Sequence, residues 1–215
     1  MKQIRKSMFE TNSSSMHSIV VTSEEHLLAE KDLFAGNYYG KNFYKDICLD
    51  DNGLWYFCKE DLDFGTHPFR ILCTLKEKTA YAIASLCSYQ CDAENTIERM
   101  EEIIETVVPD FKGFRFDKET YEDEGEEHSY DIYGGVDHQS YMLLQNVLWE
   151  EDITLEDFLL NEKYWVIIDS DDQNDYRRLM EHHIINSNIM VKRYSGWGEE
   201  PVAYDKSTNF GLNYD

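Results

Sequence analysis

Residues suited to acid–base and phosphate chemistry gather near the start of the chain, in the segment Arg5–Ser18. A histidine can act as a general base or acid near neutral pH, and Glu10 could orient His17 or serve as its acid–base partner. Arg5 and Lys6 could hold a phosphate group and stabilise charge that develops on it. The remaining polar side chains could position oxygens of the substrate: Asn12, Ser13, Ser14 and Ser15. This inventory fits work on a phosphodiester.

A plainer interpretation of the same segment is a serine-rich tail with a half-exposed histidine, because the spacing of its residues matches no catalytic signature. Two observations favour an ordered site. Lys2, Arg5 and Lys6 form the densest basic patch of an acidic chain, as a negatively charged substrate would require. The sequence also returns at once to the apolar, strand-like run Ile19-Val20-Val21. Both interpretations stay open from the sequence.

A weaker candidate is a metal site formed by Asp169, Asp171 and Asp172, at the end of the apolar run "YWVIIDSDD". Carboxylates at the end of a buried strand can bind Mg²⁺. Aspartates are equally favoured at the start of a helix, through capping and the helix dipole, and this explanation is simpler. The chain contains no phosphate-binding loop, GxGxxG, HExxH or GxSxG motif, and we expect no cofactor.

The strongest compositional feature is negative charge. Asp and Glu number 43 against 20 Lys and Arg, which gives a net charge of −23. Residues 117–131 hold eight acids and one lysine, and we expect them to form an exposed loop or the tip of a hairpin. Such a surface repels nucleic acid and attracts basic partners by fast, salt-sensitive association. Charge alone is explained most simply by a requirement for solubility. The more specific alternative is that the acidic protein occupies a basic, nucleic-acid-binding groove of a partner.

Hydrophobic periodicity predicts strands alternating with helices, which indicates an α+β fold. We expect a single globular domain over residues 1–215, with a mixed or antiparallel sheet packed by several helices and an irregular tail at 197–215. Predicted strands cover 18–22, two segments flanking Asp51-Asn52-Gly53, 114–116, "YWVIIDSDD" and "NIMVKRYSG". Predicted helices follow Thr22 and cover 75–91, 92–108, 139–149, 154–160 and 175–185.

Cysteine usage and the first residues indicate a compartment. The five cysteines are an odd number, and Met1–Arg5 leads into polar sequence rather than a secretory signal. We therefore expect a reduced, cytoplasmic protein. No run of about 18 apolar residues is present, so no membrane-spanning helix is expected. The 15 tyrosines and 11 phenylalanines are compatible with a homodimer.

The string R-K-S-M-F-E-T-N-S-S-S-M-H-S, from Arg5 to Ser18, resembles an N-terminal signature of proteins from phages, plasmids and their bacterial hosts. Some proteins of this type look like inhibitors of CRISPR immunity, including inhibitors of type II-A effector nucleases. At least one such inhibitor is associated with truncation of the guide RNA. The resemblance covers about fourteen of the 215 residues and assigns no catalytic role to any of them.

Resemblance and charge together lead to one function and two alternatives. The leading hypothesis is an anti-CRISPR protein that binds a type II effector nuclease and disables it, with the N-terminal segment contacting or cleaving its guide RNA without metal. Such an effector holds its guide–target duplex in a positively charged channel, which an acidic protein could occupy. The first alternative is an acidic nucleic-acid mimic with no catalysis. The second is an enzyme acting on a nucleotide or ADP-ribosyl substrate.

Overall fold

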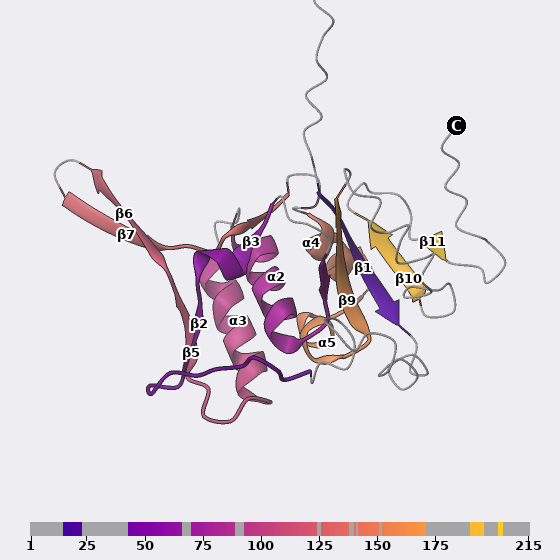
Figure 1. The fold of residues 1–215 in the computed structure, drawn as a ribbon, viewed down its shortest axis with the longest axis horizontal. Helices are drawn as coiled ribbons and strands as arrows, with labels where there is room; N and C mark the ends of the chain where they lie inside the picture. Colours follow the sequence, from indigo (N-terminus) through magenta and orange to yellow (C-terminus); the bar gives the residue numbers. More distant parts are fainter. Residues whose placement is uncertain are drawn as a thin grey trace, which may run out of the picture.

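The computed structural model describes residues 15–22, 43–65, 70–88, 93–123, 126–137, 140, 142–150, 152–170, 190–195 and 202–203. A five-stranded sheet lies at one end of the molecule (Figure 1), and every neighbouring pair of its strands is antiparallel. Its strands, in spatial order, are β11 (Val202–Ala203), β10 (Met190–Ser195), β1 (Ser15–Thr22), β9 (Tyr164–Ser170) and β4 (Arg70–Leu72).

Strand β1 lies between two partners and is longer than the sequence predicted. It begins at Ser15, three residues before the expected start, because β9 supplies partners as far as the pair Ser15–Ser170. Ile19 is fully buried at its centre. The last four residues of the segment Arg5–Ser18, from Ser15 to Ser18, therefore belong to the sheet.

Helix α2 (Leu75–Cys87) forms the centre of the molecule, and Figure 1 shows it between α3 and the five-stranded sheet. Every residue of this helix except Lys76 and Glu77 is buried, as expected for a helix that is apolar on most sides. Its start is fixed by a capping box, in which the Thr74 hydroxyl accepts a hydrogen bond from the Glu77 backbone N–H. The prediction of a helix starting at residue 75 is confirmed.

Three further helices pack around α2. Helix α3 (Ala93–Glu105) matches the predicted helix over 92–108, and Ile97, Met100 and Ile104 form an apolar stripe on its buried face. Helix α4 (Leu143–Glu150) begins four residues later than expected and contacts β1 and β10. Helix α5 (Leu155–Leu160) matches the predicted helix over 154–160 and begins with a capping box between Thr154 and Asp157. Among the described residues, no helix has the length and apolar character needed to cross a membrane.

Two small parallel sheets lie on the other side of α2. Strand β2 (Leu54–Phe57) pairs with β5 (Gly113–Phe116), and β3 (Asp63–Phe64) pairs with β8 (Gly135–Val136). The predicted turn before β2 is present, because the Asp50 carboxylate accepts from the backbone N–H groups of Asn52 and Leu54. The strand expected before that turn is only a single bridge between Leu49 and Trp55, since β2 pairs with β5 instead.

The α+β fold class is confirmed, with an antiparallel main sheet and helices packed against it. One continuous hydrophobic core runs from Ile19 in β1 to Ile168 in β9. The helices predicted after Thr22 and over 175–185 lie outside the described residues, as does the tail apart from β11. The prediction of one domain over the whole of 1–215 therefore stays a prediction.

The turn before β8 allows a stability prediction. Gly134 has φ of +66°, and a Cβ atom there would collide with the backbone carbonyl of Leu62. We expect Gly134→Ala to lower the free energy of unfolding by about 2 kcal/mol, through left-handed backbone strain and overpacking. Chemical denaturation measures this loss. Gly65→Ala is the control, since its Cβ would meet only the Asp63 side chain at 3.3 Å, and a similar loss there would contradict the argument.

Candidate functional site

The residues predicted for phosphate chemistry are placed only in part. Six of them lie outside the described residues: Arg5, Lys6, Glu10, Asn12, Ser13 and Ser14. Ser15 is the first residue of β1, and His17 follows two positions later in the same strand. The structure thus describes the surroundings of Ser15 and His17 in the sheet.

His17 is fully buried and tied to two distant elements. Its Nδ1 atom lies 3.2 Å from the hydroxyl oxygen of Tyr81 in α2, and the two rings are tilted with centroids 5.6 Å apart. Its backbone N–H donates to Oγ of Ser140 at 3.2 Å, just before the described β1–β10 register begins at Ser18. Burial raises the pKa of Tyr81, so this phenol stays neutral and can share its proton with the imidazole.

These contacts give His17 a structural role, whatever else it does. A general base must lie within hydrogen-bond reach of the proton that it moves, and the described neighbours of His17 are core groups. The imidazole joins β1 to α2, and the Ser140 hydroxyl satisfies a backbone donor at the start of the β1–β10 ladder. Its predicted part in proton transfer stays a prediction.

The contact between His17 and Tyr81 predicts the effect of a single-atom change. Tyr81→Phe removes the hydroxyl that meets Nδ1 inside the core, and we expect a loss of about 1 to 2 kcal/mol in unfolding free energy. Urea denaturation followed by tryptophan fluorescence measures it. Tyr121→Phe is the matched control, because Tyr121 is exposed; equal stability of the two variants would contradict a buried Tyr81–His17 hydrogen bond.

The residues of the predicted metal site are also placed only in part. Asp169 lies in β9 opposite Met16, while Asp171 and Asp172 are outside the described residues. Within the part of the chain that the structure describes, no group of three His, Cys, Asp or Glu residues is arranged to hold a metal ion.

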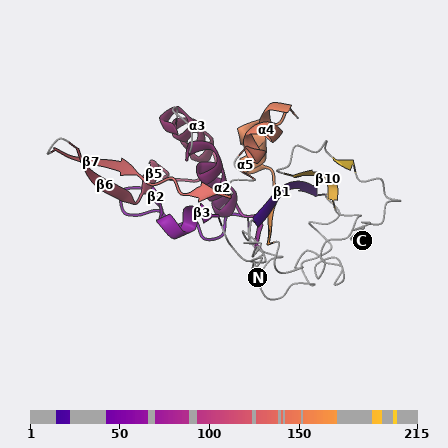
Figure 2. The ribbon, with the colours of Figure 1, turned by 90° about the horizontal axis from the view of Figure 1, so that it is seen from above.

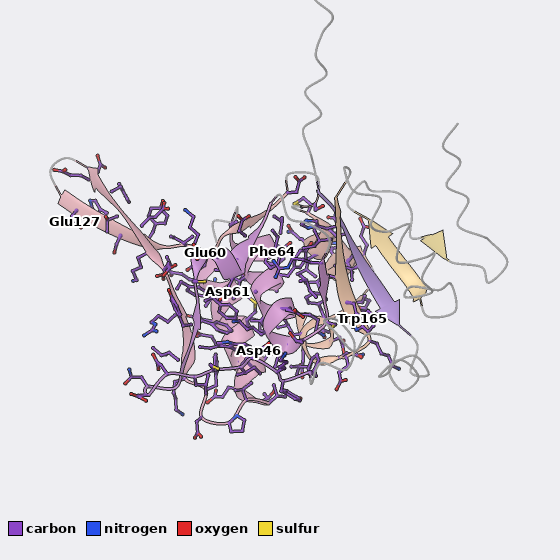
Figure 3. All side chains as sticks on the ribbon, in the orientation of Figure 1. Asp46, Glu60, Asp61, Phe64, Glu127 and Trp165 are labelled. Carbon is purple, nitrogen blue, oxygen red and sulfur yellow. The ribbon has the colours of Figure 1, made fainter. Side chains whose placement is uncertain are left out.

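The predicted acidic loop is a two-stranded antiparallel ribbon that projects from the body of the molecule (Figures 1 and 2). We call it the acidic ribbon; it consists of β6 (Lys118–Asp123) and β7 (Glu126–Asp131). All six residues of β6 are exposed, which confirms the prediction of an exposed hairpin. Figure 3 places Glu127 near the far end of the acidic ribbon, away from the core.

One face of the acidic ribbon carries aromatic rings. Residues directly opposite in an antiparallel pair share a face, and Tyr121 lies opposite His128 while Tyr130 lies opposite Glu119. The Tyr121 and His128 rings stack with centroids 5.3 Å apart, and the Tyr121 and Tyr130 centroids are 6.0 Å apart. Tyr121 is 52% exposed and Tyr130 is 49% exposed. This aromatic face was not among the sequence-based predictions, although Tyr121 and Tyr130 have the strand periodicity that places them on it.

The tip of the acidic ribbon is electrostatically unfavourable by itself. Glu122 lies directly opposite Glu127, and like charges at such a position destabilise a strand pair. At the base of the ribbon the opposite holds, since the Lys118 ammonium lies 3.4 Å from the Asp131 carboxylate. Among the described residues, negative charge is therefore uncompensated toward the tip of the acidic ribbon.

Hydrogen bonds hold the base of the acidic ribbon against β2 and the 3₁₀ helix η1 (Lys59–Leu62). The Asp117 carboxylate accepts from the Tyr56 hydroxyl and from the Lys59 backbone N–H, and these bonds lower its pKa. The Glu119 carboxylate accepts from the Tyr130 hydroxyl at 2.7 Å and from Lys59 Nζ at 3.2 Å, which lowers its pKa too. The acidic ribbon is thus anchored at its base through both carboxylates.

Comparisons with known proteins add no assignment: no protein-family model, no curated protein and no solved structure matches this chain. The features that bear on function are therefore the acidic ribbon, the surroundings of His17 and the charge of the chain.

Proposed function

We propose that this protein is an acidic binding module that places the acidic ribbon on a basic, nucleic-acid-binding surface of another protein and blocks that surface. The observation that carries the proposal is a projecting strand pair with uncompensated acids at its tip and exposed tyrosines on one face. The net charge of −23 gives the whole molecule the sign of a nucleic acid.

Electrostatics supports the choice of a basic partner. A molecule of this charge is steered toward a positive surface and repelled by free RNA or DNA, and both effects weaken as salt shortens the screening length. A basic groove shaped for a polyanion offers the complementary potential, and such complementarity raises the association rate and suppresses wrong partners. Contact with a cationic surface would also relieve the repulsion between Glu122 and Glu127.

The exposed rings supply the uncharged part of an interface. Tyrosine is enriched among the residues that dominate binding energy, because its ring buries a large area while its hydroxyl keeps a hydrogen bond. Tyr130 already has its hydroxyl bound to Glu119, so its ring is held before any partner arrives. Such preorganisation lowers the entropy cost of association.

The resemblance of the N-terminal segment makes a type II CRISPR effector nuclease the first partner to test. Its guide–target channel is positively charged, and it reads the adjacent DNA motif with arginines. Binding of the acidic ribbon in either place would prevent target recognition without any chemistry.

The test combines the protein with a type II-A effector loaded with guide RNA, then follows complex formation, target-DNA binding and guide length. We expect a complex that no longer binds target DNA and whose guide RNA keeps its full length. Absence of a complex would contradict the choice of partner. A shortened guide RNA, seen with wild type and lost in His17→Ala, would contradict the noncatalytic mode and support cleavage by the N-terminal segment.

The catalytic predictions for Glu10 and His17 stay predictions, as does an enzyme acting on a nucleotide or ADP-ribosyl group. An enzyme that acts on a nucleotide or ADP-ribosyl group would be thermally stabilised by nucleotides, which the binding-module proposal does not predict.

A further inference from the structure

A cleft of about 760 Å³ lies between the base of the acidic ribbon on one side and the end of α2 with the start of α3 on the other. Its walls come from both sides: Ser88, Glu94 and Asn95 belong to the helical side, whereas Lys118, Asp131 and Tyr133 belong to the ribbon and the segment after it. The volume falls within the range of pockets that hold small ligands or side chains of a partner.

The cleft is rich in hydrogen-bond acceptors and poor in positive charge. Three acidic residues are among those that line it, Glu94, Glu119 and Asp131, against Lys118 as the one lining base. The Glu119 carboxylate is already paired with Lys59 Nζ at 3.2 Å, so Glu94 and Asp131 are the acids that a ligand would meet. Tyr130 and Tyr133 add aromatic rings, and the Tyr133 ring is fixed edge-on against Phe116 with centroids 5.1 Å apart.

The phenol of Tyr133 reports the electrostatic character of this space. Burial raises its pKa, and the neighbouring charges of Asp131 and Glu94 raise it further. The phenol therefore stays neutral. Among the residues that line the cleft, acidic groups outnumber basic ones. An anionic ligand is disfavoured in such a cleft, although the cleft lies beside the start of α3.

A guanidinium group has the complementary chemistry. It offers five N–H donors in a plane, has no acceptor, pairs with carboxylates through two hydrogen bonds and stacks on aromatic rings. The present cation, Lys118, is 61% exposed and lies 3.4 Å from Asp131, so its pairing with that carboxylate is weak and readily exchanged.

We infer that this cleft receives an arginine side chain of the basic partner, whose guanidinium displaces the Lys118 ammonium from Asp131. The inference rests on the proposed function for the existence of that partner, and it names the chemistry of the anchor. The tip of the acidic ribbon supplies long-range attraction. The cleft selects arginine over other cations because the planar donors of a guanidinium match its carboxylates and the guanidinium stacks on its tyrosine rings.

The experiment uses the full-length, isotopically labelled protein and a tri-arginine peptide, with tri-citrulline as an uncharged control of similar shape. We expect the amide signals of Asn95 and Tyr133 to shift with tri-arginine and not with tri-citrulline. The double variant Glu94→Gln/Asp131→Asn should weaken binding by roughly fivefold or more. The control Glu98→Gln/Glu105→Gln changes the net charge equally on exposed positions of α3 and should weaken it by less than about twofold.

A gain of binding is the sharpest result. Lys118→Met removes the internal competitor of the guanidinium, so tri-arginine should bind roughly twofold to fivefold more tightly. Equal binding by the cleft variant and the α3 control, or no gain in Lys118→Met, would overturn the inference and leave general attraction by an acidic surface. Thermal unfolding of each variant confirms folding. The peptide titration needs no effector. Failure to form a complex with the effector would therefore contradict the proposed partner, whereas the peptide titration tests the cleft by itself.

Discussion

Reversing the charge at the tip of the acidic ribbon is expected to abolish binding to the basic partner. The variant Glu122→Lys/Asp123→Lys/Glu127→Lys replaces attraction by repulsion at three exposed positions that extend furthest from the body. Like charges facing each other across an interface cost several kcal/mol, so affinity should fall by about a hundredfold or more. Isothermal titration or surface plasmon resonance with guide-loaded effector measures the loss.

A matched control separates position from total charge. Glu98→Lys/Glu105→Lys/Glu156→Lys also makes three reversals of two units each, so both variants go from −23 to −17. The tip variant keeps a like-charge pair at positions 122 and 127, so the ribbon's own strand pairing is perturbed little. Losing equal affinity in both variants would show that bulk charge, and not the acidic ribbon, governs binding.

The second large effect concerns Lys78, which is fully buried in α2. Its Nζ donates to the backbone carbonyls of Phe158 at 2.8 Å and Asn161 at 2.9 Å, and it lies 4.8 Å from the centre of the Phe43 ring. These bonds satisfy carbonyls at the end of α5. Lys78→Met leaves both carbonyls without this donor, and we expect a loss of about 2 to 4 kcal/mol at pH 8.5.

This loss depends on pH with a definite sign. Burial lowers the pKa of Lys78 to about 7, from an ordinary value of 10.5. Above pH 7 the unfolded chain therefore holds a proton that the folded chain lacks, and the stability of wild type rises by about 1.4 kcal/mol per pH unit. Below pH 7 both states are protonated, and the folded protein carries the full cost of a buried charge.

The difference between wild type and Lys78→Met should accordingly grow from pH 6.5 to pH 8.5. Guanidinium denaturation at several pH values measures it, and taking the difference removes other titrating groups from the comparison. Lys76→Met is the control, because that ammonium is partly exposed and lies 3.6 Å from Asp61; its effect should stay below about 1 kcal/mol. A pH-independent difference for Lys78→Met would contradict a deprotonated lysine in the core.

Local patterns predicted most elements because local physics decides them. The all-round apolar sequence of α2, the capping box of α5 and the alternation in Phe114-Arg115-Phe116 each need only a few adjacent residues. The pairing of β2 with β5 was not predictable in this way. It joins Leu54 to Gly113, and nothing near the Asp51–Gly53 turn indicates a partner so distant in sequence.

The surroundings of His17 show the same limit more sharply. Its residue type suggested chemistry, yet its contacts come from Tyr81 and from Ser140, which is 123 residues away in sequence. From the sequence, Tyr81 is only one residue of the predicted helix over 75–91. A polar ring inside an apolar helix needs a partner, and that rule could have flagged Tyr81 without naming His17.

Equilibrium competition on the guide-loaded effector is the most direct test of the central claim. Fluorescence anisotropy of labelled target duplex follows its release as this protein is added. We predict complete displacement, with an inhibition constant equal to the directly measured affinity, and displacement that disappears in Glu122→Lys/Asp123→Lys/Glu127→Lys. A stable complex that holds effector, duplex and this protein together would contradict occupation of a nucleic-acid-binding surface.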